Sequence, residues 1–386
     1  MVGLHSRPAD EELAAVAYDR VLQRMFFDAG LAGVIFPPEC GGLGLTPEHQ
    51  RALNEELVGY EWPSRFTVPT MSPCGALLLE FATDELKRQH IPAILRGEEI
   101  WMQFLSEPSG GSGMAAALTT AVRDGDDWVL NGSKVWTTGA WWADWAICLA
   151  RTDWDVPKHA GLTMFALPIH QPAIEVRQIE MLNGARDFCQ EYLTDVRVPD
   201  SHRMGEVGQG WTVATRLLFH ERMQRNSPYV THPAVAPHGP GEFPAAAVAR
   251  DAARLEDPLA RDLVGEARVL DLAGSALQRR VMAGMRSGQL PDNASGIARL
   301  FSTVASARTA EIRFELAGGP VAVWGDDDGA AAGIGDAFLM RQAGSIGGGT
   351  TEMARNVVAE RVLGMPREQA RDRGIPSRDV PRGASR

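Results

Sequence analysis

The feature that most constrains the fold is the middle stretch from Trp101 to Arg151, which separates two regions of helical periodicity. Its short apolar runs, such as Trp128 to Leu130 and Ala146 to Leu149, are bounded by polar turn residues, as is typical of strands. Asn131-Gly132 is a dipeptide that strongly favours a two-residue hairpin, because both residues tolerate positive φ. The stretch therefore predicts local antiparallel β-structure with a hairpin turn at residues 131–132.

A loop rich in glycine and serine lies inside this stretch. Residues 106–113 read SEPSGGSG and offer many unblocked backbone N–H groups to an anion or to a planar polar ring. Taken alone, such a loop is most often only a turn. Trp136-Thr137-Thr138, later in the same stretch, adds an aromatic side chain and two hydroxyls. Together they suggest a site for a cofactor.

The flanking regions predict an α+β chain with an N-terminal α-helical domain (1–98), a middle antiparallel β-domain (99–207) and a C-terminal helical bundle (208–366). Before the β-domain, helical periodicity marks 11–29, a run that starts at Pro47 with Thr46 as its cap, 75–81 and 85–95; after it, the periodicity marks 211–222, 246–285, 295–316 and 351–363. Strand patterns mark 161–169, 174–182 and 189–199. We expect a long loop at the proline-rich residues 225–245 and a disordered tail at 367–386.

Composition and motifs exclude several classes of protein. A formal charge of −11 argues against nucleic-acid binding, and no apolar stretch is long enough to span a membrane. Acidic residues near the N-terminus do not fit a signal peptide, so we expect a cytoplasmic protein. The four scattered cysteines predict reduced thiols and no metal site. No strand leads into G-x-G-x-x-G, and no Gly-Lys-Ser/Thr is present, so neither a Rossmann unit nor a P-loop is supported.

The motifs of the middle stretch occur in a recognisable order. Phe-Leu-Ser-Glu-Pro, Gly-Ser, Asn-Gly-x-Lys-x-Trp-x-Thr and Ala-Arg-Thr-Asp follow one another, and SIGGGTTEMAR occurs near the C-terminus. This order resembles the acyl-CoA dehydrogenase family over nearly the whole chain. The resemblance implies FAD as cofactor and α,β-dehydrogenation of an acyl-CoA thioester in fatty-acid β-oxidation. It also implies an electron-transfer flavoprotein as electron acceptor, and a homotetramer or a heterotetramer with a paralogous subunit.

The resemblance also implies which residues contact FAD. In the β-domain, the matching positions are Phe104, Ser106, Ser112, Trp136 and Thr138. In the C-terminal domain they are Thr350 and Glu352, and Gly318 with Gly319 resembles the Gly-Gly that lines the FAD of a neighbouring subunit. Two positions depart from the family pattern. Gly113 stands where Asp is usual, and the Arg-x-x-Phe-Gly element that contacts the pyrophosphate is not visible.

The catalytic base requires a separate argument, because Gly348 occupies the position at which many family members carry their catalytic Glu. Other members place the base on the helix after the β-domain, in a Leu-x-x-Glu-Arg context. Here the string LLFHERM offers Glu221 followed by Arg222. We therefore predict Glu221 as the base, with Gly348 and Arg222 near the substrate, as in a branch that resembles bacterial dehydrogenases for bulky acyl-CoA substrates. An exposed Glu-Arg pair on a helix surface is the alternative.

Three other functions fit the sequence. The chain could be a structural or flavin-lending subunit of a heteromeric acyl-CoA dehydrogenase, which the proline-rich segment and Gly113 favour. A flavin monooxygenase on the same fold needs no base at position 348. The third alternative is a non-catalytic scaffold that binds CoA or an acyl-carrier protein.

Overall fold

The computed structural model describes residues 8–223, 227–233, 243–323, 329–367, 369–370 and 372–380. The chain forms two compact units, Met1–Ala236 with Ala370–Arg386, and Pro237–Gln369. The α+β class is confirmed, with helices before and after a middle sheet. The domain boundaries at residues 98, 207 and 366 stay predictions.

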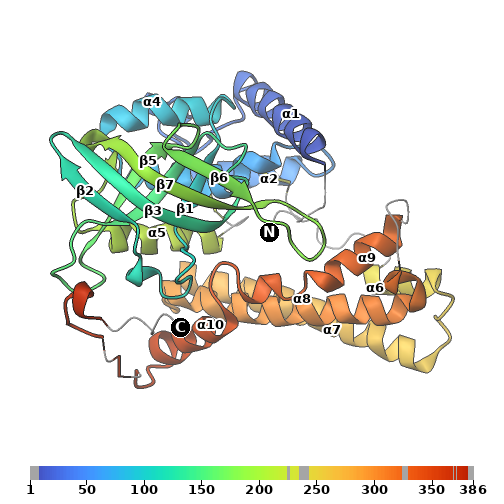
Figure 1. Ribbon diagram of the computed structural model, residues 1–386. Helices are drawn as coiled ribbons and strands as arrows, with labels where there is room; N and C mark the ends of the chain where they lie inside the picture. The colour runs from blue at the N-terminus through green and yellow to red at the C-terminus, as the bar shows by residue number, and fades with distance from the viewer. Residues whose placement is uncertain are drawn as a thin grey trace. The chain divides into compact units, whose positions relative to one another are not determined.

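The first unit begins with four α-helices among the described residues, α1 (Ala9–Asp28), α2 (Pro47–Glu56), α3 (Ala76–Phe81) and α4 (Asp84–Leu95). Helix α2 begins at Pro47 after Thr46, as predicted, because Thr46 caps the helix and proline is tolerated in its first turn. Helix α4 begins where the Thr83 hydroxyl accepts a hydrogen bond from the Leu86 N–H at 3.3 Å. Figure 1 shows the blue helices α1 and α4 beside the green strands of the same unit.

The middle sheet contains eight strands in the described residues. They are β1 (Trp101–Phe104), β2 (Thr120–Asp124), β3 (Asp127–Thr138), β4 (Trp145–Arg151), β5 (Leu162–Pro168), β6 (Ile174–Gln178), β7 (Phe188–Pro199) and β8 (Arg203–Met204). The order is β6-β7-β3-β2-β4-β5-β8, and β1 pairs with β4. Most pairs are antiparallel, whereas β4 pairs in parallel with β1 and β2. Strand β5 is buried along almost its whole length, and apart from Thr163 its residues are apolar.

The predicted hairpin turn at Asn131-Gly132 is wrong. Both residues lie inside β3, and the turn is formed instead by Gly125 and Asp126, between the paired residues Asp124 and Asp127. At residues 131–132 the pairing of β3 with β7 shifts register, as at a β-bulge. Glycine is required there because a Cβ on Gly132 would lie only 2.7 Å from the Cα of Thr119.

Helix α5 (Gly210–Met223) belongs to the first unit and packs against β5 and the irregular segment Thr67–Gly75. The segment 227–233 that follows is held to α2. The Asn54 amide donates to the carbonyl of Val230 at 3.1 Å, and its oxygen accepts from the N–H of His232 at 3.2 Å. These contacts keep the chain beyond α5 against the N-terminal helices.

The second unit contains five α-helices in its described part, α6 (Pro244–Asp251), α7 (Pro258–Arg286), α8 (Ser295–Ala317), α9 (Gly329–Leu339) and α10 (Thr351–Val357). Figure 1 shows α7 and α8 side by side. The single helix predicted over 246–285 is divided, because Asp257 caps a new helix that starts at Pro258. Helix α9 was not predicted. Of the predicted loop 225–245, residues 225–226 and 234–242 lie outside the described residues.

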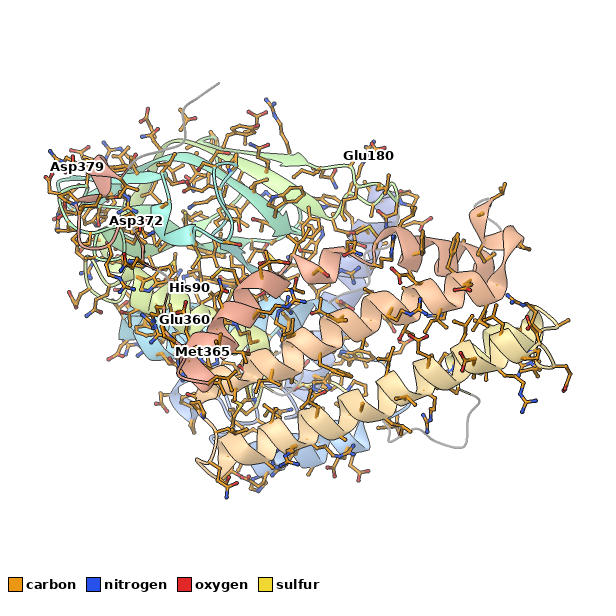
Figure 2. The ribbon with its side chains drawn as sticks, turned by 90° about the horizontal axis from the view of Figure 1, so that it is seen from below. His90, Glu180, Glu360, Met365, Asp372 and Asp379 are labelled. Carbon is orange, nitrogen blue, oxygen red and sulfur yellow. The ribbon has the colours of Figure 1, made fainter. Side chains whose placement is uncertain are left out.

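Residues 372–380 differ from the disordered tail predicted for the C-terminus. The Ser377 N–H donates to the carbonyl of Val156 at 2.8 Å, and two ion pairs, Lys158–Asp372 and Arg378–Asp155, flank this contact. Figure 2 shows Asp372 and Asp379 beside the strands of the first unit. Backbone pairing together with opposite charges therefore orders this segment.

Candidate functional site

Buried charged groups fix the ends of the loop between β1 and β2. The Glu107 carboxylate accepts hydrogen bonds from the N–H groups of Leu118 at 2.6 Å and Thr119 at 2.9 Å, and from the Lys134 ammonium at 2.8 Å. Lys134, fully buried on β3, also donates to the carbonyl of Leu149 at 2.6 Å. Burial alone would raise the pKa of Glu107, but Lys134 and the backbone donors outweigh it and hold this pKa below its usual value.

A second buried cation holds the last part of the same loop. The Arg151 guanidinium donates to the carbonyls of Ala115 at 2.6 Å and Ala117 at 3.1 Å. By contrast, the middle of the loop borders open space, since a Cβ on Gly110 or Gly113 would meet no atom within 4 Å. The predicted residue Ser112 is exposed here. The loop thus combines fixed ends with a glycine-rich, accessible middle.

Strand β3 brings Trp136 and Thr138 beside this loop. The N–H of Val135 donates to the carbonyl of Ser106 at 2.9 Å, so the start of the loop runs next to the end of β3. Trp136 lies at a register shift of β3 against β7, has φ 68° and exposes 57% of its surface. Positive φ is costly for a bulky residue, and such strain occurs most often at functional sites. An exposed indole in strained backbone is consistent with a ring-binding surface.

The other predicted β-domain residues are close in the sheet but differ in exposure. Thr138 ends β3 and is half-buried, as is Ser106. Phe104 ends β1 and is completely buried, so only its backbone can serve a ligand. The structure therefore gathers Phe104, Ser106, Trp136 and Thr138 at the adjoining ends of β1 and β3.

Glu221 lies in the last turn of α5 and is half-buried. The Gln103 amide nitrogen, from β1, is 3.3 Å from its carboxylate oxygen Oε2 and donates a hydrogen bond to it. The Cys74 thiol lies close enough for the Glu221 charge to add to burial in raising the pKa of that thiol. Glu221 is therefore not the exposed surface residue of the alternative interpretation. The adjacent Arg222 is exposed.

Glu80 on α3 fixes the last two turns of α5. Its carboxylate accepts two hydrogen bonds from Arg216, at 2.6 and 2.9 Å, and is 2.8 Å from His220 Nε2. Burial lowers the pKa of His220, although Glu80 opposes the shift. The Ser72 hydroxyl donates to the carbonyl of His220 at 3.4 Å. These contacts set the direction in which Glu221, the next residue, leaves the helix.

The remaining predicted residues lie in the second unit. Gly318 ends α8 with φ 72°, and Gly319 follows it. Gly348, with φ 66°, belongs to the glycine run before α10. The Thr350 hydroxyl accepts from the Met353 N–H at 3.1 Å and caps α10. Glu352 is exposed in the first turn of that helix.

Sequence reasoning missed three residues of the site, Gln103, Glu107 and Lys134. Glu107 and Lys134 belong to the quoted motifs Ser-Glu-Pro and Asn-Gly-x-Lys, but nothing local indicates that they pair. Gln103 carried no signal in the sequence. Its carbonyl oxygen is buried and has no hydrogen-bond partner among the described residues.

Two further properties concern the described residues as a whole. No group of three or more His, Cys, Asp or Glu side chains among them could hold a metal ion, and none of their helices is long and apolar enough to cross a membrane. All four cysteines are buried free thiols, as predicted.

Comparisons with known proteins cover nearly the whole chain. Residues 5–98 match the acyl-CoA dehydrogenase N-terminal domain, residues 103–196 the middle domain and residues 208–363 the C-terminal domain. Acyl-CoA dehydrogenase IpdE1 of Mycobacterium tuberculosis is 31% identical over 341 residues, which are 88% of this chain and 86% of the relative. Acyl-CoA dehydrogenase FadE34 of the same organism is 33% identical over 359 residues, which are 92% of this chain but only 47% of the relative.

Solved structures agree with these matches. The Tcur3481-Tcur3483 steroid ACAD aligns with a TM-score of 0.75 and 25% identity, over 94% of this chain and 99% of the other. The ChsE4-ChsE5 complex from Mycobacterium tuberculosis aligns with a TM-score of 0.72 and 25% identity, over 94% of both chains.

Proposed function

Because the chain belongs to the acyl-CoA dehydrogenase family of oxidoreductases, we propose that it uses FAD to dehydrogenate the Cα–Cβ bond of an acyl-CoA thioester, with Glu221 as the base. The observation that carries the proposal is the Glu221 carboxylate, half-buried and hydrogen-bonded by Gln103 at the β1 side of α5. Gly348, which has no side chain, cannot serve as base.

The β-domain residues fit a flavin. The exposed Trp136 offers an aromatic face, and the open space beside Gly110 and Gly113 lets an anion such as a pyrophosphate approach the loop backbone. We assign Ser106, Ser112, Trp136 and Thr138, with the Phe104 backbone, to FAD. Thr350 and Glu352 are assigned to FAD as well, and Gly318 with Gly319 to the FAD of a neighbouring subunit. When bound, FAD supplies the two-electron acceptor for the hydride that leaves Cβ.

The chain itself supplies proton transfer. Glu221 removes the Cα proton, while the Gln103 amide holds the carboxylate and favours its ionised form. The Glu80 contacts to Arg216 and His220 keep the last turn of α5 in place. We place the thioester near Gly348 and Arg222.

The substrate is proposed to carry a bulky acyl group. One solved relative is named a steroid ACAD, which supports a polycyclic thioester for this chain as well. That relative and the ChsE4-ChsE5 complex are each named for two proteins, which supports a heteromer with a paralogous subunit. An electron-transfer flavoprotein as acceptor and a cytoplasmic location remain predictions.

An anaerobic titration tests the proposed function. The purified protein, alone or co-expressed with its paralogous subunit, is mixed with straight-chain, branched and polycyclic acyl-CoA thioesters while flavin absorbance is followed. We expect bleaching with a bulky thioester, and Glu221→Gln should abolish it because an amide cannot accept the proton. Glu206→Gln, an exposed carboxylate before α5, serves as the control and should bleach like the wild type. Bleaching that is unchanged in Glu221→Gln would refute the assigned base.

A second candidate is a subunit that lends structure or flavin contacts to a catalytic partner. Gly348 and Gly113, which replace the acidic residues usual in the family, favour it. In that case Glu221→Gln in the assembled heteromer leaves bleaching intact, whereas removing the acidic base of the paralogous subunit abolishes it.

A further inference from the structure

The loop that we assign to FAD is held by hydrogen bonds at its ends and is accessible in its middle. Glu107, near its start, accepts hydrogen bonds from Leu118 and Thr119 at its end, so one carboxylate closes the loop. Lys134 joins that carboxylate from β3 and also donates to the carbonyl of Leu105 at 3.3 Å. Residues 108–113 between these points are accessible or half-exposed.

The Glu107–Lys134 pair is almost completely buried. The two side chains expose only 4% and 0% of their surface. A buried ion pair is costly to desolvate, and well-packed apolar side chains often replace one without loss of stability. What the pair provides is geometry, because each charge needs its partners at fixed distances. Leu105, Glu107 and Leu149 are thereby held around the Lys134 ammonium, and Leu118 and Thr119 around the Glu107 carboxylate.

The same strand carries the surface assigned to the flavin ring. Lys134 precedes Trp136 by two residues on β3, and between them the N–H of Val135 donates to the carbonyl of Ser106. A shift of Lys134 would therefore move both the start of the loop and the strained backbone at Trp136. The ion pair therefore links the position of the loop at 106–113 to that of the Trp136 backbone.

We propose that Glu107 and Lys134 are positioning residues, a buried clasp that preforms the loop at 106–113 against Trp136 and so sets the affinity for FAD. This inference rests on the proposed function. A preformed loop binds more tightly because its ordering cost is met during folding and not during binding. The clasp residues touch neither substrate nor reacting atoms.

The test uses the full chain, assembled with its paralogous subunit where needed, and measures FAD binding independently of turnover. Apoprotein of Lys134→Met, Glu107→Gln and the double variant is titrated with FAD, and the visible circular dichroism of the bound flavin is recorded. Leu86→Ala, a truncation in the buried core of α4, is the control for a general loss of stability.

We expect each single variant to weaken FAD binding by about tenfold and the double variant to lose less than the product of the two, because the residues act as one pair. The control should lower the melting temperature without changing FAD affinity. An FAD affinity within twofold of wild type in Lys134→Met and in the double variant would overturn the clasp. If the single variants fail to fold, the FAD affinity of the double variant alone tests the proposal, because that variant buries no charge from this pair. A wild type that takes up no FAD, even with its partner, overturns the proposed function and the clasp together.

Discussion

The Gln103 amide donates a hydrogen bond to the Glu221 carboxylate at 3.3 Å. We expect Gln103→Leu to slow anaerobic flavin reduction by about tenfold and to move the pH of half-maximal rate upward, because a donor to the ionised carboxylate is lost. Stopped-flow reduction from pH 6 to 9 measures both effects. Gln209→Leu, which alters an amide before α5, should change neither. An unaltered rate and pH profile in Gln103→Leu would remove Gln103 from the mechanism.

Glu191 on β7 provides a pH-dependent prediction. It is fully buried, and burial raises its pKa from 4.5 to about 8. The unfolded chain therefore releases this proton near pH 4.5 and the folded chain only near pH 8, so stability falls across that window, by roughly 1.4 kcal/mol per pH unit. Glu191→Gln removes this loss. We expect it to raise the melting temperature clearly at pH 8 and little at pH 5, and an equal shift at both would contradict the assignment.

At this scale the sequence predicted residues but not their partners. Glu221 followed from its Leu-x-x-Glu-Arg context, and the exposure of Trp136 fits the role expected for it. Gln103 could not be found, because it and Glu221 are 118 positions apart and meet only when β1 packs beside α5. The buried Lys134 was likewise invisible, since a lysine is usually solvated.

Among the elements, β3 provides a test of local packing. A Cβ on Gly132 would approach Thr119 to between 2.5 and 2.8 Å, whereas one on Gly125 meets nothing within 4 Å. We expect Gly132→Ala to lower the free energy of unfolding by about 1–3 kcal/mol through overpacking. Gly125→Asn is the control. Gly125 also has positive φ but open space around it, and Asn tolerates positive φ better than most residues, so this change should cost clearly less than Gly132→Ala. Urea denaturation measures both, and equal losses would show that space at residue 132 is not the cause.

The elements also show where sequence patterns stop being informative. Gly125-Asp126 and Asn131-Gly132 both consist of residues that favour a two-residue turn, and only strand pairing decides which one turns. Helix α9 escaped prediction because GAAAGIGDAFL lacks alternation of polar and apolar faces. The runs at 161–169 and 189–199 do contain β5 and β7, since they are apolar or alternate with period two.

At the scale of the whole molecule, the second unit combines a small buried core with exposed apolar side chains. Its buried apolar cluster, among the described residues, comprises Ala245, Ala249, Ala260, Leu263, Ala267, Ile312 and Leu316. Helix α7 meanwhile exposes Val269 by 64% and Leu272 by 51%. Exposed apolar side chains on a unit with so small a core favour burial against another subunit. We expect an oligomer in solution.

Mass photometry tests this expectation. Val269→Lys combined with Leu272→Lys should shift the population to smaller species, because charge is buried poorly at an interface. Val122→Lys, an equally exposed position on β2 in the first unit, is the matched control and should leave the mass unchanged. An unaltered mass in the double variant would place the contact elsewhere.

At the same scale, the resemblance to a family predicted helices, sheet and helices in the right order. It did not predict that residues 372–380 pair with residues 154–158, because neither segment has a motif. This return has a topological consequence. Because the chain leaves the first unit, forms the second and then returns to the first, residues 237–369 form a loop whose two ends are both anchored in the first unit. Removing the last seventeen residues would release one end of this loop. With the first unit folded, residues 237–369 would then have more conformational freedom to lose when they fold, although no side chain among them is changed.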